Sequence, residues 1–256
     1  MNGYESLKIS EKKEWGDNYF SLFLKNKEIS EIVLPGNFFM VKIPSFEKGA
    51  ILPRPFSIAR VFKEKGLFEL FFQVVGKGTE VFSKLNEGHS IEILGPLGNK
   101  FPITTNKKII MVAGGRGISP FLYLSEILKR EKKDFLLIYG GKCEKDIKFK
   151  SYLSAYNTLF VTEDGSYGKK GLVTDFLPKG YFTVFSCGPD IMMKKVYEFY
   201  KESSSEVFVS LEERMACGTG VCYGCAKKIK RGDKTEMVRV CQEGPVFNAE
   251  EVVWDE

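Results

Sequence analysis

The sequence predicts a multidomain β plus α/β fold: a small antiparallel β-barrel, a doubly wound α/β domain and a short cysteine-rich domain. Three observations lead to this prediction. Up to about residue 102, short runs rich in Val, Ile, Phe and Leu are broken by Gly, Pro and Asn. From residue 107, strand-like runs alternate with amphipathic helical runs. Four of the 6 cysteines lie in the last 40 residues. We therefore expect domains at 1–102, 103–205 and 206–256.

Two segments of the predicted barrel carry groups that could bind a ligand. The run from Arg54 to Ser57 joins a fixed positive charge, a proline and a hydroxyl, which suit a pyrophosphate and the edge of a flavin ring. The turn at 75–79 ends a strand and opens a helix over 79–85, whose N-terminus would attract an anion. Taken alone, each segment more often has a structural role than a ligand-binding one. The sequence predicts barrel strands at 19–24, 38–42, 54–61, 67–74 and 90–94.

The α/β domain opens with its clearest unit, a buried strand at 107–113 followed by a turn of sequence Gly-Gly-Arg-Gly-Ile at 114–118. Ser119 is expected to cap the next helix, with Pro120 at its first position. Ligands of such sheets bind beyond the carboxyl ends of the strands. The full G-x-G-x-x-G pattern is absent, so an ordinary Rossmann dehydrogenase is not indicated, and a sheet that only supports a partner stays an alternative. Further strands are predicted at 135–139, 158–162, 181–186 and 207–211, and further helices at 148–155, 174–177 and 190–201.

The cysteine spacing in the last domain predicts a [2Fe–2S] cluster. The first three of these cysteines are separated by four and two residues, as in plant-type ferredoxins, and glycines lie between them. Glycines allow a backbone to wrap closely around a cluster and to direct its N–H groups at sulfur. A zinc site, a disulfide pair and buried free thiols are the alternatives. The predicted ligands are Cys217, Cys222, Cys225 and Cys241.

Composition and charge bear on the location of the protein and on whether it binds nucleic acid or a membrane. The chain has 256 residues, 43% of them hydrophobic, and a net charge of +5 spread over segments of mixed sign, which does not indicate nucleic acid. No apolar run approaches the roughly 20 residues of a membrane span, and the first residues do not resemble a signal peptide. We therefore expect a cytoplasmic protein that does not bind a membrane. Cys143 is expected to be an ordinary thiol.

Taken in order, the motifs resemble those of known families. Arg54-Pro-Phe-Ser, Gly78-Thr79, the segment 115–120 and Cys187-Gly-Pro resemble the ferredoxin–NADP reductase superfamily over about the first 200 residues. The segment 210–218, the remaining cysteines and the tail 244–247 resemble the electron transfer subunits of dihydroorotate dehydrogenase B, over essentially the whole chain. The resemblance implies that FAD is bound by Arg54, Pro55, Phe56, Ser57, Phe71, Phe72, Gln73, Gly78 and Thr79. It implies an NAD site at Gly115, Gly117, Pro120, Cys187, Gly188 and Pro189, and a cluster held by the four cysteines.

The resemblance also implies a function. A separate catalytic subunit containing FMN would oxidise dihydroorotate, and its electrons would pass through the cluster and FAD of this chain to NAD⁺, in pyrimidine (UMP) biosynthesis. This chain would hold no catalytic residue for dihydroorotate, and two copies would join a catalytic dimer as a heterotetramer. We expect Tyr223 and the loop 222–225 to border that partner. The alternatives are a flavin and iron–sulfur reductase subunit of a ferredoxin- or hydrogenase-type complex, and a regulatory subunit without flavin.

Two positions depart from the pattern of many relatives. Arg116 stands in a turn that often contains only glycine, so it either alters nucleotide binding or faces solvent at the tip of a loop. His89, the one histidine of the chain, replaces an acidic residue and is expected on the surface. The sequence does not decide between NAD and NADP, although Asp164 favours NAD weakly.

Overall fold

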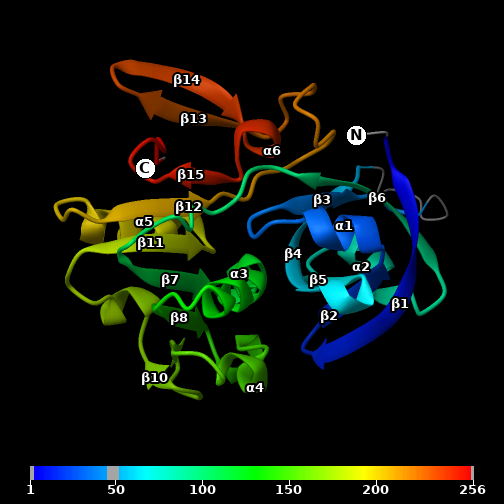
Figure 1. Ribbon diagram of the computed structural model, residues 1–256, viewed down its shortest axis with the longest axis horizontal. Helices are drawn as coiled ribbons and strands as arrows, with labels where there is room; N and C mark the ends of the chain where they lie inside the picture. Colours follow the sequence, from blue (N-terminus) through cyan, green and yellow to red (C-terminus); the bar gives the residue numbers. More distant parts are fainter. Residues whose placement is uncertain (1–2, 45–51, 255–256) are drawn as a thin grey trace.

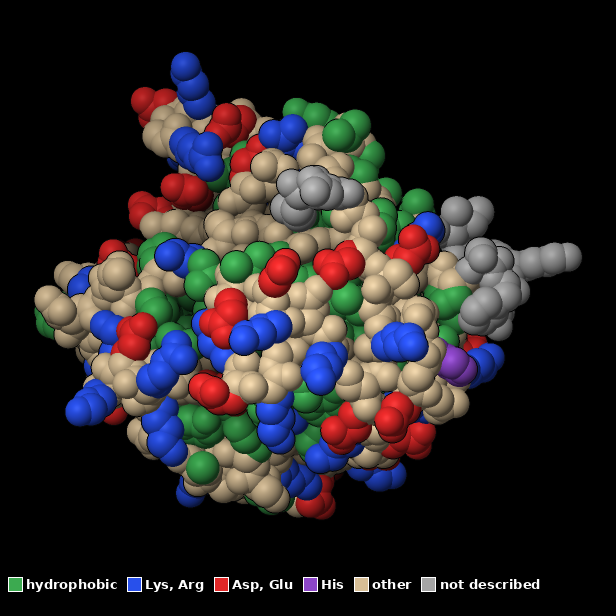
Figure 2. All heavy atoms as spheres, turned by 45° about the vertical axis from the view of Figure 1, so that its right-hand side comes forward, with side chains coloured by type: hydrophobic (Ala, Val, Ile, Leu, Met, Phe, Trp, Pro, Cys, Tyr) green, Lys and Arg blue, Asp and Glu red, His purple; other side chains and the backbone are tan. Residues whose placement is uncertain are grey.

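The computed structural model describes residues 3–44 and 52–254. It confirms the predicted fold class, with the barrel beside an α/β sheet and the cysteine-rich segment across the top of both in the view of Figure 1. Basic and acidic side chains are intermingled over the face shown in Figure 2, as the dispersed charge of the sequence predicts. No helix in the described ranges is long and apolar enough to cross a membrane.

The barrel is closed by six antiparallel strands in the order β1-β2-β5-β4-β3-β6. Among its strands and α-helices, two elements were not predicted. β1 is strongly charged and buries few side chains beyond Leu7 and Ile9, so its alternation is weak. The short helix α1 is capped by the side chain of Asn26, which accepts a hydrogen bond from the Ile29 N–H at 3.0 Å. The elements are β1 (Glu5–Gly16), β2 (Tyr19–Lys25), α1 (Lys27–Ile32), β3 (Phe38–Val41), β4 (Arg54–Phe62), η1 (Lys63–Lys65), β5 (Leu67–Gln73), α2 (Lys77–Lys84) and β6 (Ser90–Leu97).

The α/β sheet has seven strands in the order β10-β9-β8-β7-β11-β12-β15. Neighbouring strands are parallel except for β15, which pairs antiparallel with β12. The elements are β7 (Lys108–Gly114), η2 (Gly115–Ile118), α3 (Ser119–Arg130), β8 (Phe135–Gly141), η3 (Glu144–Asp146), α4 (Lys150–Leu153), β9 (Thr158–Thr162), β10 (Lys169–Lys170), η4 (Val173–Phe176), β11 (Phe182–Cys187), α5 (Asp190–Tyr200) and β12 (Glu206–Ser210).

The structure corrects three local predictions in this domain. Ser119 does not cap α3, because the 3₁₀ turn η2 runs directly into the helix and makes Ser119 its first residue. The predicted helix at 148–155 is reduced to the four residues of α4, because Phe149 before it has left-handed backbone angles. The predicted helix at 174–177 is the 3₁₀ turn η4, which ends as the chain becomes extended at Leu177.

The cysteine-rich segment forms a hairpin of β13 (Ala226–Arg231) and β14 (Lys234–Arg239), then α6 (Val240–Glu243) and β15 (Val246–Asn248). Figure 1 shows the hairpin projecting above the sheet. Because β12 and β15 both belong to the α/β sheet, the first and last strands of the cysteine-rich segment lie in that sheet, and the division at 102 and 205 stays a prediction.

One hydrophobic core joins the three parts. Met40 and Leu97 of the barrel belong to the same buried cluster as Val209 of the sheet and as Cys225 and Val240 of the cysteine-rich segment. Polar contacts support this packing: the Asn99 side chain after β6 donates to the Val246 carbonyl at 2.7 Å and accepts from the Val246 N–H at 2.9 Å. The position of the cysteine-rich segment is therefore fixed against both other parts.

Candidate flavin, nucleotide and iron–sulfur sites

A cavity of about 230 Å³ lies at the barrel strands β4 and β5. Eight of the nine residues that the resemblance implied for FAD line it, and Gly78 does not. Gly78 packs against the Arg54 side chain: a Cβ added at Gly78 would lie 2.7 Å from the Arg54 Nε. The lining residues from the prediction are Arg54, Pro55, Phe56, Ser57, Phe71, Phe72, Gln73 and Thr79.

Local hydrogen bonds fix the positions of two residues that line the flavin cavity, Arg54 and Thr79. The Arg54 guanidinium donates to the Leu52 carbonyl at 2.6 Å and lies beside Gly78 in the first turn of α2. The Thr79 hydroxyl accepts from the Val75 N–H at 2.9 Å and donates to the Gly76 carbonyl at 3.0 Å. Thr79 therefore orders the turn with its own hydroxyl, while the guanidinium of Arg54 presents a fixed positive charge to the cavity.

The other parts of the chain complete the flavin cavity. Ser119 is 5% exposed, lines the cavity, and its hydroxyl has no hydrogen-bond partner within the described residues. An unpartnered buried hydroxyl in the wall of a cavity could be satisfied by a polar ligand, so the site fits a flavin nucleotide. The sequence did not identify the walls contributed from outside the barrel, because they come from distant positions: Arg116, Ser119, Ser210, Leu211, Glu212, Glu213, Met215 and Pro245.

A second cavity, of about 800 Å³, lies at the carboxyl ends of the parallel strands. Gly115, Gly117, Gly188 and Pro189 line it, as the resemblance implied, and the other two predicted residues do not. Both of those are buried behind the lining loops. Cys187 is 2% exposed, and its burial raises the pKa of its thiol. Pro120 lies in the first turn of α3. The cavity is large enough for a dinucleotide and has its glycine turn at the start of a helix, where a pyrophosphate fits.

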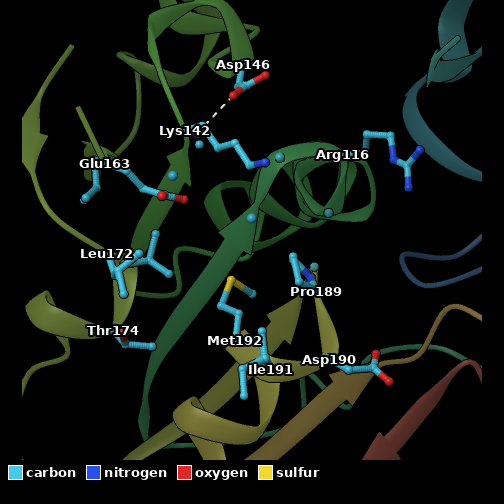
Figure 3. A pocket seen from close by; sticks show the side chains of 18 of the residues that line it. Arg116, Lys142, Asp146, Glu163, Leu172, Thr174, Pro189, Asp190, Ile191 and Met192 are labelled. Carbon is cyan, nitrogen blue, oxygen red and sulfur yellow. Dashed lines mark hydrogen bonds between the residues drawn. The ribbon is translucent and has the colours of Figure 1, made fainter. Parts of the chain in front are cut away.

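Figure 3 shows acidic and basic side chains on the walls of this cavity. Asp146 accepts from the backbone N–H of Lys142 at 3.0 Å and so orders the loop after β8. Asp164 does not line the cavity, because its carboxylate accepts from both the N–H (2.9 Å) and the hydroxyl (2.6 Å) of Ser166. Its neighbour Glu163 lines the cavity instead, and only the fold distinguishes these adjacent carboxylates.

The four predicted cluster ligands form two pairs. The Cys217 side chain interacts with that of Cys222, and the Cys241 side chain with that of Cys225. No group of three or more Cys, His, Asp or Glu side chains in the described ranges is arranged for a single metal ion. Two pairs of cysteines fit a two-iron cluster, in which each iron takes two protein ligands.

Backbone N–H groups already point at these sulfurs. The N–H groups of Thr219, Gly224 and Cys241 each lie 3.4 Å from a cysteine Sγ. Although burial acts in the opposite direction, hydrogen bonds from the backbone of Cys222 and from Thr219 lower the pKa of the Cys217 thiol to about 6. Thiolates are the form in which cysteines bind iron, so the loop fits a [2Fe–2S] cluster.

Arg239, for which the sequence predicted no role, stabilises the loop that carries the first three cysteines. Its Nη1 donates to the Gly220 carbonyl at 3.0 Å, and its Nη2 lies 2.6 Å from Glu243. The same guanidinium lies 5.1 Å from the centre of the Tyr223 ring. Arg239 therefore ties the loop that carries the first three cysteines to α6, which carries the fourth.

Comparison with known proteins agrees with this fold and these sites. Residues 6–101 match the family model "Oxidoreductase FAD-binding domain", and residues 111–198 match "Oxidoreductase NAD-binding domain". A ferredoxin NADP⁺ reductase from Neisseria gonorrhoeae solved with FAD and NADP shares the fold, with a TM-score of 0.66 and 18% identity over 77% of this chain and 90% of that one. The chain is thus an NAD-linked oxidoreductase subunit, and it has the fold of ferredoxin–NADP reductases.

The C-terminal segment defines the family within that class. Residues 212–253 match the model "Iron-sulfur cluster binding domain of dihydroorotate dehydrogenase B". The chain is 36% identical over 253 residues to the electron transfer subunit of dihydroorotate dehydrogenase B (NAD(+)) from Listeria innocua, covering 96% of this chain and 97% of the relative. It is 38% identical to the subunit from Clostridium acetobutylicum, covering 98% and 95%. The chain belongs to the family of dihydroorotate dehydrogenase B electron transfer subunits.

A solved structure extends this likeness beyond the family. The protein described as an NADH-dependent reduced ferredoxin–NADP oxidoreductase, in a study of flavin-based electron bifurcation, has a TM-score of 0.85 and 28% identity to this chain, covering 99% of this chain and 92% of that one. The arrangement of barrel, α/β sheet and cysteine-rich segment is therefore shared with an electron-transfer protein of another name.

Proposed function

We propose that this chain carries electrons from dihydroorotate oxidation, performed at the FMN of a partner catalytic subunit, through its [2Fe–2S] cluster and FAD to NAD⁺. One observation carries the proposal: the flavin cavity is lined jointly by the barrel, by the glycine turn of the α/β sheet and by the segment that leads to the cysteines. The cavity also shares Gln73, Val75, Arg116 and Glu212 with the nucleotide cavity. A flavin held there would lie between the cluster and the nicotinamide.

Different residues of the chain would bind each of the cofactors. When bound, FAD exchanges two electrons with nicotinamide as hydride and single electrons with an iron–sulfur cluster. Arg54 would bind the FAD pyrophosphate, and the unpartnered hydroxyl of Ser119 would bind a polar edge of the flavin. The glycine turn and Pro189 would hold the dinucleotide at the sheet edge, where Glu163 can accept from a ribose hydroxyl.

The exposed side of the cysteine loop is the proposed contact with the catalytic subunit. Val221 and Tyr223 are 80% and 55% exposed, and Cys222 between them is exposed as well. Large apolar side chains that surround a ligand of the cluster suit a partner surface across which an electron must pass. We propose a heterotetramer of two such chains on a catalytic dimer, and a cytoplasmic location.

The visible spectrum of the anaerobically purified chain tests the proposal. We expect flavin and cluster absorption that bleaches with NADH, and that bleaches equally with dihydroorotate once the FMN-containing subunit is added. Bleaching with NADH alone, in the presence of an active catalytic subunit, would instead favour a reductase subunit of a ferredoxin-type complex, which the likeness to the ferredoxin–NADP oxidoreductase makes the second candidate. A colourless protein would contradict both.

Replacing Arg54 tests the flavin site directly. Arg54→Ala removes the guanidinium that faces the flavin cavity, and a lost charge-assisted hydrogen bond weakens binding by about 10- to 100-fold. We expect the variant to purify with much less FAD but with its full iron content. The control is Arg231→Ala, since this residue lies on the hairpin and pairs with Glu236 at 2.8 Å. Full flavin content in Arg54→Ala would show that the arginine is structural.

A further inference from the structure

Arg116 lies where the two cavities meet. It is the second residue of η2, at the tip of the glycine turn after β7, and it lines both the flavin and the nucleotide cavity. In Figure 3 its guanidinium extends away from Glu163 and Leu172, which mark the far wall of the nucleotide cavity. The side chain therefore has its charge at the end of the nucleotide cavity that faces the flavin.

Among the described residues, Arg116 has only a loose partner. Its Nη2 lies 3.9 Å from the Oε2 of Glu212, beyond hydrogen-bond distance, and the two side chains are 42% and 58% exposed. Arg54 and Arg239, in contrast, each have an oxygen partner at 2.6 Å. An exposed ion pair at this separation contributes little stability and can be broken easily by a stronger anion.

The charges around the nucleotide cavity favour such an anion-binding residue. Four carboxylates line the cavity against three cationic side chains, and Lys227 pairs with one of these carboxylates, Asp190, at 3.4 Å, so the lining supplies no excess of positive charge for a pyrophosphate. Of the three cations, Arg116 alone belongs to the glycine turn, which is where the pyrophosphate of a dinucleotide lies in doubly wound folds. The carboxylates are Asp146, Glu163, Asp190 and Glu212, and the cations are Arg116, Lys142 and Lys195.

We propose that Arg116 is a nucleotide-binding residue that exchanges partners: it pairs with Glu212 when the nucleotide site is free and binds the pyrophosphate of the dinucleotide when the site is filled. The inference rests on the proposed function, in which that dinucleotide is NAD(H). Glu212 belongs to the segment leading to the cysteines, so binding of the dinucleotide would also release a contact between the glycine turn and that segment. A guanidinium suits this role because its donors match the geometry of phosphate oxygens.

Binding of ADP-ribose, measured by calorimetry on the chain loaded with FAD and cluster, tests the proposal without any redox reaction. We expect Arg116→Gln to weaken ADP-ribose binding by about 10- to 100-fold, the effect of losing charge-assisted hydrogen bonds, when it is compared with wild type at equal FAD content. Arg116→Lys should restore part of the affinity. Glu212→Gln should tighten binding by up to about fivefold, because the competing exposed pair is weak. Arg231→Gln, which removes one positive charge on the hairpin, should change nothing.

The double variant distinguishes exchange of partners from simple repulsion. If Glu212 acts by holding Arg116, Glu212→Gln should no longer increase ADP-ribose affinity once Arg116→Gln is also present. If the increase in affinity persists in the double variant, Glu212 only repels the nucleotide, and the exchange of partners by Arg116 is refuted. Equal ADP-ribose affinity of wild type and Arg116→Gln overturns the inference alone. A loaded wild-type chain that binds neither ADP-ribose nor NADH overturns the proposed function as well.

Discussion

A Cys222→Ser variant is expected to retain FAD and NADH-dependent flavin reduction but to lose its cluster and its electron exchange with the catalytic subunit. Cys222 is exposed, so the substitution removes a ligand without opening a cavity in the core. Iron content should fall from about two atoms per chain towards zero. The rate of electron transfer from dihydroorotate should fall by at least about 100-fold. Loss of a residue that only hydrogen-bonds to a metal ligand already lowers metal affinity or activity by about 10- to 100-fold.

Two measurements separate this result from general damage. Iron content and the visible spectrum report the cluster, while NADH reduction of the bound flavin reports the rest of the chain. Cys143→Ser is the matched control: Cys143 is a free cysteine in the α/β domain, away from the four ligands, and its variant should keep iron and transfer at wild-type levels. Full iron content and unchanged transfer in Cys222→Ser would refute the assignment of this ligand.

A Gly117→Ala variant is expected to lose stability and nucleotide affinity together. An added Cβ would overlap the Cys187 carbonyl and lie 2.7 Å from the Gly188 nitrogen, and all of these are backbone atoms that cannot rotate away. The glycine turn and the loop after β11 must therefore separate. We expect a loss of about 1–3 kcal/mol in the free energy of unfolding, or about 2–4 °C in melting temperature for each kcal/mol in a chain of this size.

Nucleotide binding should suffer more than stability does, because these same two loops line the nucleotide cavity. A displacement of about 1 Å at a positioned site costs on the order of 100-fold, and we expect ADP-ribose affinity to fall by about 10- to 100-fold while FAD content is kept. Gly76→Ala is the control, since its Cβ would meet no atom within 4 Å and its backbone is extended. Wild-type affinity and melting temperature in Gly117→Ala would contradict the close packing of the two loops.

The sequence was most informative where a function needs particular residue types at fixed spacing. Three cysteines with four and two residues between them, and glycines between those cysteines, indicated the cluster before any fold was known. Strong hydrophobic periodicity placed β5, β7 and β8 within one or two residues. The charged strand β1 and the hairpin β13–β14 were missed, because strands that bury little apolar surface leave a weak pattern.

Predictions from local sequence were less reliable for residues whose role depends on their three-dimensional surroundings. Ser119 has the residue type of a helix cap, but a 3₁₀ turn leads into the helix, and Ser119 lines the flavin cavity instead. Asp164 was considered a weak indication of NAD, yet its carboxylate accepts hydrogen bonds from Ser166, while its neighbour Glu163 lines the nucleotide cavity. Backbone geometry decides the first case and hydrogen bonds to a nearby residue decide the second, and residue type alone reveals neither.

The sequence by itself determined the fold class, the kinds of cofactor and the family, because these depend on local periodicity and on motifs read along the chain. Only the tertiary structure decided how the sites meet. Residues 210–213, Met215 and Pro245 close the flavin cavity, Arg239 joins the cysteine loop to α6, and Arg116 comes within 3.9 Å of Glu212. These contacts join residues far apart in the chain, and they exist because one shared hydrophobic core fixes the three parts against each other.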